Sequence, residues 1–167
     1  YRDDARRFYN ELPARLQKFD LEVAPEKTRQ LRFSRHKPTR KVSFQFLGFS
    51  FFWGVANTGK CVVMMRTAKE KQKASIKRMC AWIKYNRSSS VTLILKRVKK
   101  MLQGFVNYFG VPGNAKSITA YQYYTRLALY KWLNRRSQRR SYNWTEFNHL
   151  LCCFNVRTLR VKPRMFR

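Results

Sequence analysis

Two adjacent carboxylates at the start of the chain, in the stretch YRDD, are the first residues whose types and spacing could do chemistry. A Tyr-x-Asp-Asp box can hold the divalent metal ions of phosphoryl transfer when it lies in the turn of a β-hairpin. Here the following residues have helical periodicity, with one apolar stripe of Phe8, Leu12, Leu16 and Phe19. Asp3 and Asp4 therefore begin a predicted helix over 3–19, where carboxylates accept free backbone N–H groups and complement the helix dipole. We interpret them as a helix cap.

Positive charge dominates the composition of the 167 residues. Lys and Arg number 37 against 8 Asp and Glu, a formal net charge of +29. From residue 71 onward Glu146 is the sole acid. Such a chain repels itself unless a polyanion neutralises it, and nucleic acid is the first candidate. An anionic membrane is the second, but there is neither a lipidation motif nor an apolar run of the ~18 residues that a span needs. We therefore expect no membrane partner.

The four cysteines form no Cys-x-x-Cys pair. His149 and Cys152 could share one helical face, but zinc needs four ligands and the other histidine lies far away in the sequence. We therefore expect no metal site. Reduced cysteines favour a cytoplasmic protein, of either a bacterial or an organellar host.

Hydrophobic periodicity divides the chain into two parts. The first, 1–66, is predicted to hold one helix and about four short strands, at 21–23, 29–33, 44–51 and 61–65, with a hairpin turn at 57–59. The second, 67–155, is predicted to be helical, with helices at 68–86, 91–109, 118–135 (capped by Ser117) and 145–153. A basic tail, 156–167, follows. The fold class is α+β, and the small sheet is incomplete.

Four blocks of sequence together resemble the C-terminal half of group II intron-encoded reverse transcriptase/maturases: LQKFDLEVAPEKTRQLRFSR, FQFLGFSFFW, GFVNYFGVPGNAKSI and KWLNRRSQRRSYNW. They occur in the family's order and spacing, and the resemblance covers nearly the whole chain. The resemblance implies that residues 1–66 are the end of a reverse-transcriptase palm with a primer-grip-like hairpin. It implies that residues 67–155 are the all-α thumb, called domain X or the maturase domain.

The resemblance also implies where catalysis would lie. The family's Tyr-Ala-Asp-Asp hairpin would precede Tyr1, so we expect this chain to be an inactive fragment on its own. Mg²⁺ is expected in the full-length RNA-directed DNA polymerase, and no cofactor is expected in this fragment. Lys27 matches a candidate general acid for the leaving pyrophosphate, a role that exists only in a full-length enzyme. Phe46, Leu47, Gly48 and Phe49 match the primer grip, although a strand with a packed aromatic face would look similar.

The helical part offers candidate RNA-binding residues. Lys96, Arg97, Lys99 and Lys100 surround a helix whose apolar face is Ile94, Val98 and Leu102, so the charges are predicted to point outward. Asn107 and Tyr108 could offer a hydrogen bond and a stacking ring, or Tyr108 could be the edge of the core. Arg135, Arg136, Arg139 and Arg140 form the densest basic cluster, and arginine suits bidentate phosphate contact. In the resembling family this block lies in domain X, which contacts intron RNA during splicing.

We therefore expect a segment that binds group II intron RNA and the RNA–DNA template–primer, and that supports RNA splicing and RNA-directed DNA synthesis in the full-length protein. The missing N-terminal fingers and palm are expected as a covalent or assembled partner. The alternative is a stand-alone basic RNA-binding module without enzymatic activity, or a decayed remnant of such an open reading frame.

Overall fold

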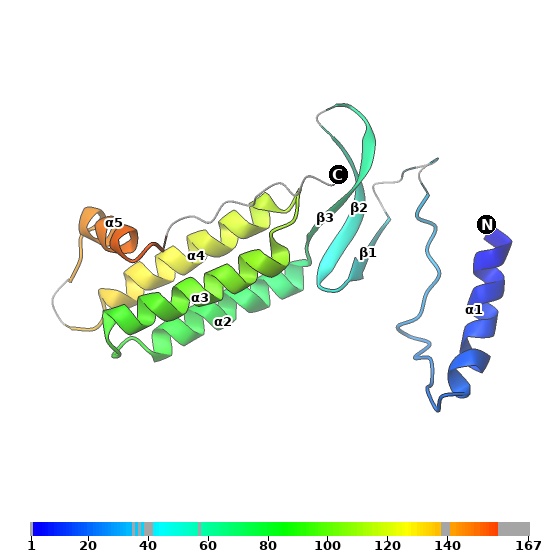
Figure 1. The fold of residues 1–167 in the computed structure, drawn as a ribbon, viewed down its shortest axis with the longest axis horizontal. Coiled ribbons are helices and arrows are strands. Elements are labelled where there is room, and N and C mark those ends of the chain that lie inside the picture. The colour runs from blue at the N-terminus through cyan, green and yellow to red at the C-terminus, as the bar shows by residue number, and fades with distance from the viewer. Residues whose placement is uncertain are drawn as a thin grey trace. The chain divides into compact units, whose positions relative to one another are not determined.

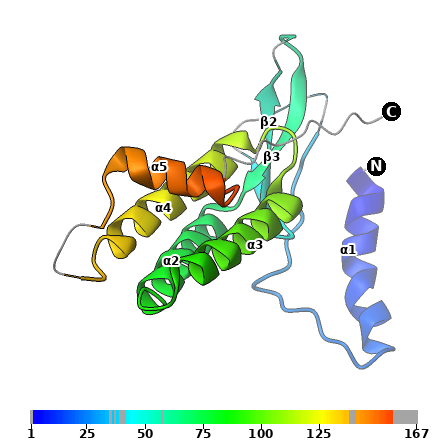
Figure 2. The same ribbon diagram turned by 60° about the vertical axis from the view of Figure 1, so that its left-hand side comes forward.

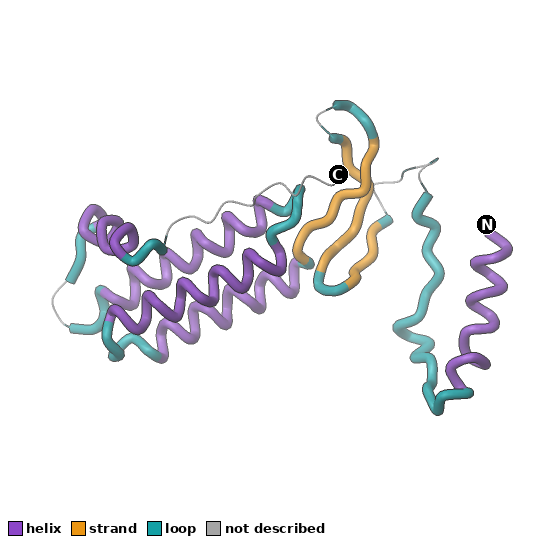
Figure 3. The backbone as a smooth tube through the Cα atoms, viewed as in Figure 1, coloured by secondary structure: helices purple, strands orange, loops and turns teal. Residues whose placement is uncertain are grey.

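The computed structural model describes residues 2–34, 36, 38, 42–56, 58–137 and 141–156. In this part of the chain it contains five α-helices and one three-stranded antiparallel sheet (Figure 1 and Figure 3), which confirms the α+β class. Two compact units are present, Tyr1–Val42 and Ser43–Arg167. The division at residue 66, which followed from the change to helical periodicity, stays a prediction.

The first unit consists of helix α1 (Arg2–Gln17) and an irregular segment. Asp3 and Asp4 lie in the first turn of α1, as predicted. No residue of α1 is buried, and Phe8 and Phe19 of its apolar stripe are 61% and 71% exposed. The described part of this unit therefore leaves the apolar stripe of α1 largely open to solvent.

The strands expected at 21–23 and 29–33 do not form. The backbone between them bonds locally instead, because the N–H groups of Lys27 and Thr28 donate to the Ala24 carbonyl at 3.1 and 3.0 Å. A strand requires a neighbouring strand to accept and donate its backbone hydrogen bonds. Alternating apolar residues alone were therefore not enough to predict one.

The second unit begins with a sheet in the order β1 (Ser43–Phe46), β2 (Phe49–Val55) and β3 (Cys61–Thr67). The predicted single strand over 44–51 is wrong, because Phe46 pairs with Phe49 and the chain reverses at Leu47-Gly48. Both turn residues have positive φ, 48° and 79°. Positive φ at both central residues is the geometry of a type I′ turn, whose twist matches that of the flanking strands. The predicted hairpin between β2 and β3 is confirmed, although Asn57 lies outside the described residues.

Helices α2 (Lys69–Tyr85), α3 (Val91–Phe109) and α4 (Ala115–Leu133) lie side by side, and the short α5 (Trp144–Cys153) packs on them (Figure 2). Each begins and ends within three residues of its predicted bounds. The expected cap is wrong, because α4 begins earlier and Ser117 is buried inside its first turn. Glu146 and Asn143 cap α5 reciprocally, side chain to backbone, at 2.8 Å each.

The core of the bundle consists of Met79, Ile83, Ile94, Leu95, Val98, Leu102, Phe105, Val106, Ile118, Tyr121, Ala128, Leu129, Leu133, Phe147 and Leu151.

Tyr121 places a titratable hydroxyl group in this core. Its ring stacks on Phe105 with centroids 3.9 Å apart, and the residue is buried. Burial disfavours the phenolate and raises the pKa of Tyr121 to about 12.

Below pH 10, the neutral phenol of Tyr121 contributes to the stability of the fold. We expect that contribution to be lost as pH rises from 10 to 12. The unfolded chain ionises this phenol first, near pH 10, so the free energy of unfolding falls by about 2 kcal/mol across the window. Urea denaturation of the wild-type chain and of Tyr121→Phe at several pH values measures this. Phe keeps the ring and removes the titrating group, so an equal loss of stability in both proteins would contradict the prediction.

Candidate nucleic-acid interface

The β1–β2 turn is held against the C-terminal end of α3. The hydroxyl of Tyr108 donates to the Leu47 carbonyl at 2.9 Å, and the Tyr108 ring stacks on Phe49 at 5.9 Å between centroids. Phe49 is buried and also packs on Phe109 at 5.2 Å. The N–H of Ala68, just before α2, donates to the Gly48 carbonyl at 2.9 Å. The structure therefore joins two predicted sites, the primer-grip-like block and Tyr108, into one surface.

The turn presents apolar side chains to solvent. Phe46 and Leu47 are 59% and 66% exposed, whereas Phe49 faces inward. The positive φ of Gly48 favours glycine at this position. Close packing does not require it, because a Cβ added there would meet the Phe109 ring at an ordinary 3.6 Å. The backbone conformation, rather than close packing, therefore explains the glycine.

A buried amide fixes the junction behind this turn. Asn114 is 1% exposed; its Oδ1 accepts from the Thr67 N–H at 2.9 Å. Its Nδ2 donates to the Thr67 hydroxyl and to the Phe109 carbonyl, both at 2.8 Å. One side chain thereby ties the end of β3 to the end of α3 and to the start of α4. The sequence analysis missed it, because an asparagine after a Pro-Gly pair looks like an ordinary turn residue.

The cationic face of α3, as we call the exposed side formed by Lys96, Arg97, Lys99 and Lys100, leads toward the same turn. Its four members are exposed, whereas Ile94, Val98 and Leu102 are buried, as predicted. Exposed Asn107 lies farther along α3, and its Oδ1 accepts from Gln103 Nε2 at 2.6 Å. Positions three and four apart share a helix face, so Lys96, Lys100 and Asn107 lie in one row that ends beside Tyr108.

Gly104 lies along this row, and because it has no side chain the backbone of α3 is uncovered there. It is exposed in the interior of α3, and a Cβ added there would meet nothing within 4 Å. A glycine inside a helix costs about 0.5–1 kcal/mol relative to alanine. No packing requirement inside the described chain accounts for it.

The predicted arginine cluster is only partly described, because Arg139 and Arg140 lie outside the described residues. Arg136 Nη2 donates to the carbonyls of Ser89 and Ser88 at 2.6 and 3.4 Å, so it fastens the end of α4 to the loop after α2. The Arg135 guanidinium lies 5.8 Å from the Trp132 ring. These two arginines therefore have different surroundings.

Three further cations surround the same indole. Lys84, Arg87 and Lys131 place their charges 5.5, 5.7 and 5.4 Å from the Trp132 ring centroid. With Trp132 and Arg135 they form what we call the Trp132 pole. The sequence analysis missed it because its members are separated in sequence and only the packing of α2 against α4 brings them together.

Lys27, the candidate general acid, is exposed in the turn at 24–28 of the first unit. Its catalytic role stays a prediction, as does the Mg²⁺ of a full-length enzyme. Among the described residues, no cluster of three or more His, Cys, Asp or Glu could hold a metal ion. No described helix combines the length and apolarity needed to cross a bilayer.

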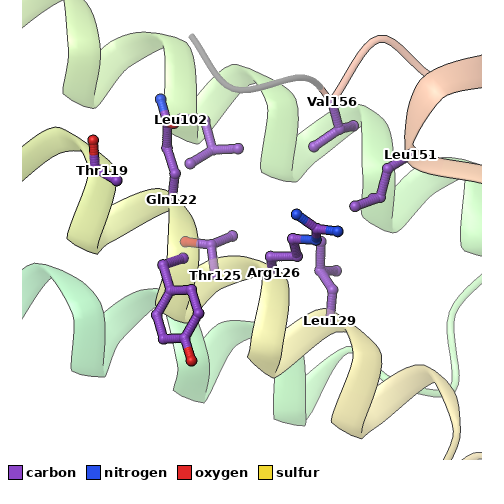
Figure 4. Close-up of a pocket in the computed structure, with 9 residues that line it drawn as sticks. Leu102, Thr119, Gln122, Thr125, Arg126, Leu129, Leu151 and Val156 are labelled. Atoms are coloured by element: carbon purple, nitrogen blue, oxygen red, sulfur yellow. The ribbon is translucent and has the colours of Figure 1, made fainter. Parts of the chain in front are cut away.

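A pocket of about 160 Å³ lies where α3, α4 and α5 meet (Figure 4). Arg126 lines it, donates to Asn148 Oδ1 and lies 4.9 Å from the Trp144 ring, so it links α4 to α5. Leu102, Leu129 and Leu151 supply apolar walls. We interpret this pocket as a small gap in helix packing rather than a ligand site.

The fold and the site define a basic α+β chain whose helical bundle exposes cations that its own acids do not neutralise. Residues 69–149 match the family model for the group II intron, maturase-specific domain. This match supports the resemblance of the helical part to the C-terminal region of group II intron maturases. Searches of curated proteins and of solved structures found no match.

We expect Asn114→Ala to lower the free energy of unfolding by about 2 to 4 kcal/mol, because the buried Thr67 N–H loses its acceptor and two further hydrogen bonds disappear. Urea denaturation measures the change. Asn107→Ala is the matched control, since this exposed amide should change stability by less than about 0.5 kcal/mol. Equal effects of the two substitutions would show that Asn114 does not tie the junction.

Proposed function

We propose that this segment binds structured group II intron RNA through the cationic face of α3 and the β1–β2 turn. In a full-length protein the same surface would also hold the RNA–DNA template–primer. The observation that carries the proposal is the row of exposed cations on α3. This row lies inside the maturase-specific domain and leads to a turn held by Tyr108.

Electrostatics supports contact with the nucleic-acid backbone rather than with base edges. The lysines and arginines of the cationic face are exposed around an apolar helix side and can reach successive phosphates. Double-stranded RNA hides its base edges in a deep, narrow major groove, so proteins recognise it mostly by shape, phosphates and 2′-hydroxyls. A straight helix with outward charges suits that task.

The turn supports a positioning role. The Leu47 carbonyl accepts from Tyr108 and the Gly48 carbonyl accepts from Ala68, so both turn carbonyls are engaged within the chain. A primer end would therefore meet the exposed side chains of Phe46 and Leu47. Because the same contacts fix the turn to α3, a strand held on the cationic face would be guided past these two residues.

Polymerisation is assigned to the full-length protein. Two-metal phosphoryl transfer needs clustered carboxylates, and Asp3 and Asp4 lie in the first turn of a helix instead. The exposed apolar stripe of α1 is consistent with cover from the fingers and the rest of the palm, as covalent or assembled partner.

RNA binding is expected to weaken steeply with salt, because each neutralised phosphate contributes about −0.7 to −0.9 to the slope of log affinity against log salt. Replacing Lys96, Arg97 and Lys100 by Gln should reduce the magnitude of that slope by about 2 and lower affinity at least ~10-fold. Fluorescence anisotropy with a labelled intron RNA measures both.

The matched control for this variant is Lys69, Lys73 and Lys77 replaced by Gln, which removes the same charge from exposed positions of α2. Its slope should stay near that of the wild type. A wild-type slope shallower than about −2, or equal losses in both variants, would refute a binding face on α3.

Gly104→Ala separates stability from binding. The substitution should stabilise the fold by about 0.5–1 kcal/mol, because alanine favours the helix. It should nevertheless weaken binding to RNA duplex several-fold, because the new methyl group stands where the backbone of α3 would approach the ligand. Thermal denaturation and anisotropy, run on the same preparations, report the two effects. A stabilised variant with unchanged affinity would exclude close approach at Gly104.

A further inference from the structure

Four cations from three segments converge on one aromatic ring at the Trp132 pole. Lys84 comes from the last turn of α2, Arg87 from the following loop, Lys131 from the last turn of α4 and Arg135 from just after that helix. Their charges all lie 5.4 to 5.8 Å from the ring centroid. The pole occupies the end of the bundle where α2 ends and α3 begins, away from the sheet (Figure 1).

Few acids of the same unit are available to neutralise this cluster. The sequence from 43 to 167 contains two acids, Glu70 and Glu146. Glu70 lies in the first turn of α2, about 21 Å along the helix axis from Lys84. The carboxylate of Glu146 accepts the N–H of Asn143 in the cap of α5. The second unit therefore offers only two carboxylates to balance the four cations of the pole.

The indole compensates this repulsion only in part. The attraction of a cation to a half-buried ring is modest, and one ring has only two faces for four charges. At the same time the cluster is held in place, because Arg136 fastens the loop after α2 to the end of α4. Cations that are preorganised and unneutralised form a site for an anion.

An aromatic residue that follows Lys84 in the sequence indicates which anion the cluster would bind. Tyr85 follows Lys84 at the end of α2 and is 87% exposed, the highest exposure among the large hydrophobic residues of the described chain. Proteins that bind single-stranded nucleic acid combine cations for the phosphates with exposed rings on which bases stack. A base inside a duplex is already stacked on its neighbours and offers no free face, so such a ring selects unpaired nucleotides.

We propose that the Trp132 pole and Tyr85 form a second RNA site, distinct from the cationic face of α3, for an unpaired nucleotide and its flanking phosphates in a loop or bulge. Lys84, Arg87, Lys131 and Arg135 take the phosphates, and Tyr85 stacks on the base. This site rests on the proposed RNA-binding function and adds the class of RNA element that the far end of the bundle recognises.

The test uses the full chain and two labelled RNAs of equal length, a stem–loop and a fully paired duplex, at one salt concentration. Lys84, Arg87 and Lys131 replaced together by Gln should lower affinity for the stem–loop at least tenfold. Affinity for the duplex should change no more than in the control with Lys69, Lys73 and Lys77 replaced by Gln. Circular dichroism verifies that each variant is folded.

Tyr85→Ala should lower affinity for the stem–loop alone, by about 5- to 100-fold, the range expected for one stacked base. Tyr85→Phe keeps the ring and should retain wild-type affinity, and Tyr124→Ala controls for loss of another exposed tyrosine. Equal losses on both RNAs, or no loss on the stem–loop, would overturn the second site while leaving the α3 face intact. Failure of the wild-type chain to bind either RNA would overturn the proposed function as well.

Discussion

The architecture of the second unit depends on a single buried amide. Asn114 accepts the backbone N–H of Thr67, donates to the hydroxyl of that residue and donates to the carbonyl that ends α3. A buried polar side chain is tolerated only when its hydrogen bonds are made, so this geometry allows little variation. The end of α3 carries Tyr108, and Tyr108 holds the β1–β2 turn. The placement of the exposed turn relative to the cations of α3 therefore follows from hydrogen bonds inside the protein rather than from any feature of the surface.

Around that fixed frame, the distribution of charge is tolerable for folding and favourable for binding. The lysines and arginines of the helices are mostly exposed, where two unit charges 4 Å apart interact by only about 1 kcal/mol in water. The apolar core can therefore stabilise a bundle of strongly positive charge. The same charges act together on a polyanion, because each neutralised phosphate releases counterions. The exposed charges that cost the free protein little stability would thus contribute much of the free energy of binding to a polyanion.

The helices could be predicted from sequence because their apolar residues repeat at the helical period and their packing partners are close in sequence. Short strands were less predictable. The strand expected at 61–65 is present, but the segment at 29–33 has the alternation of a strand and forms none, and Gly48 forms a turn where we expected one continuous strand. The cationic face of α3 was predictable residue by residue, because one helix determines which side is exposed. Its junction with the turn, the role of Asn114 and the Trp132 pole all depend on contacts between distant segments, for which a single sequence contains no signal.

The two ends of the bundle differ in the chemistry they offer. At one end, α3 ends beside a turn whose exposed groups are apolar; at the other, cations converge on an indole beside an exposed tyrosine. A helix of 19 residues separates them by about 28 Å. An RNA that satisfied both ends would need paired structure along α3, because backbone shape is what that face can read, and an unpaired nucleotide near the pole, because only an unstacked base offers a face to a ring. A long single strand or a continuous duplex would meet one requirement but not both. The rigid spacing between the ends would thus let a small basic bundle favour folded RNA over other polyanions, although electrostatic attraction alone would not distinguish between them.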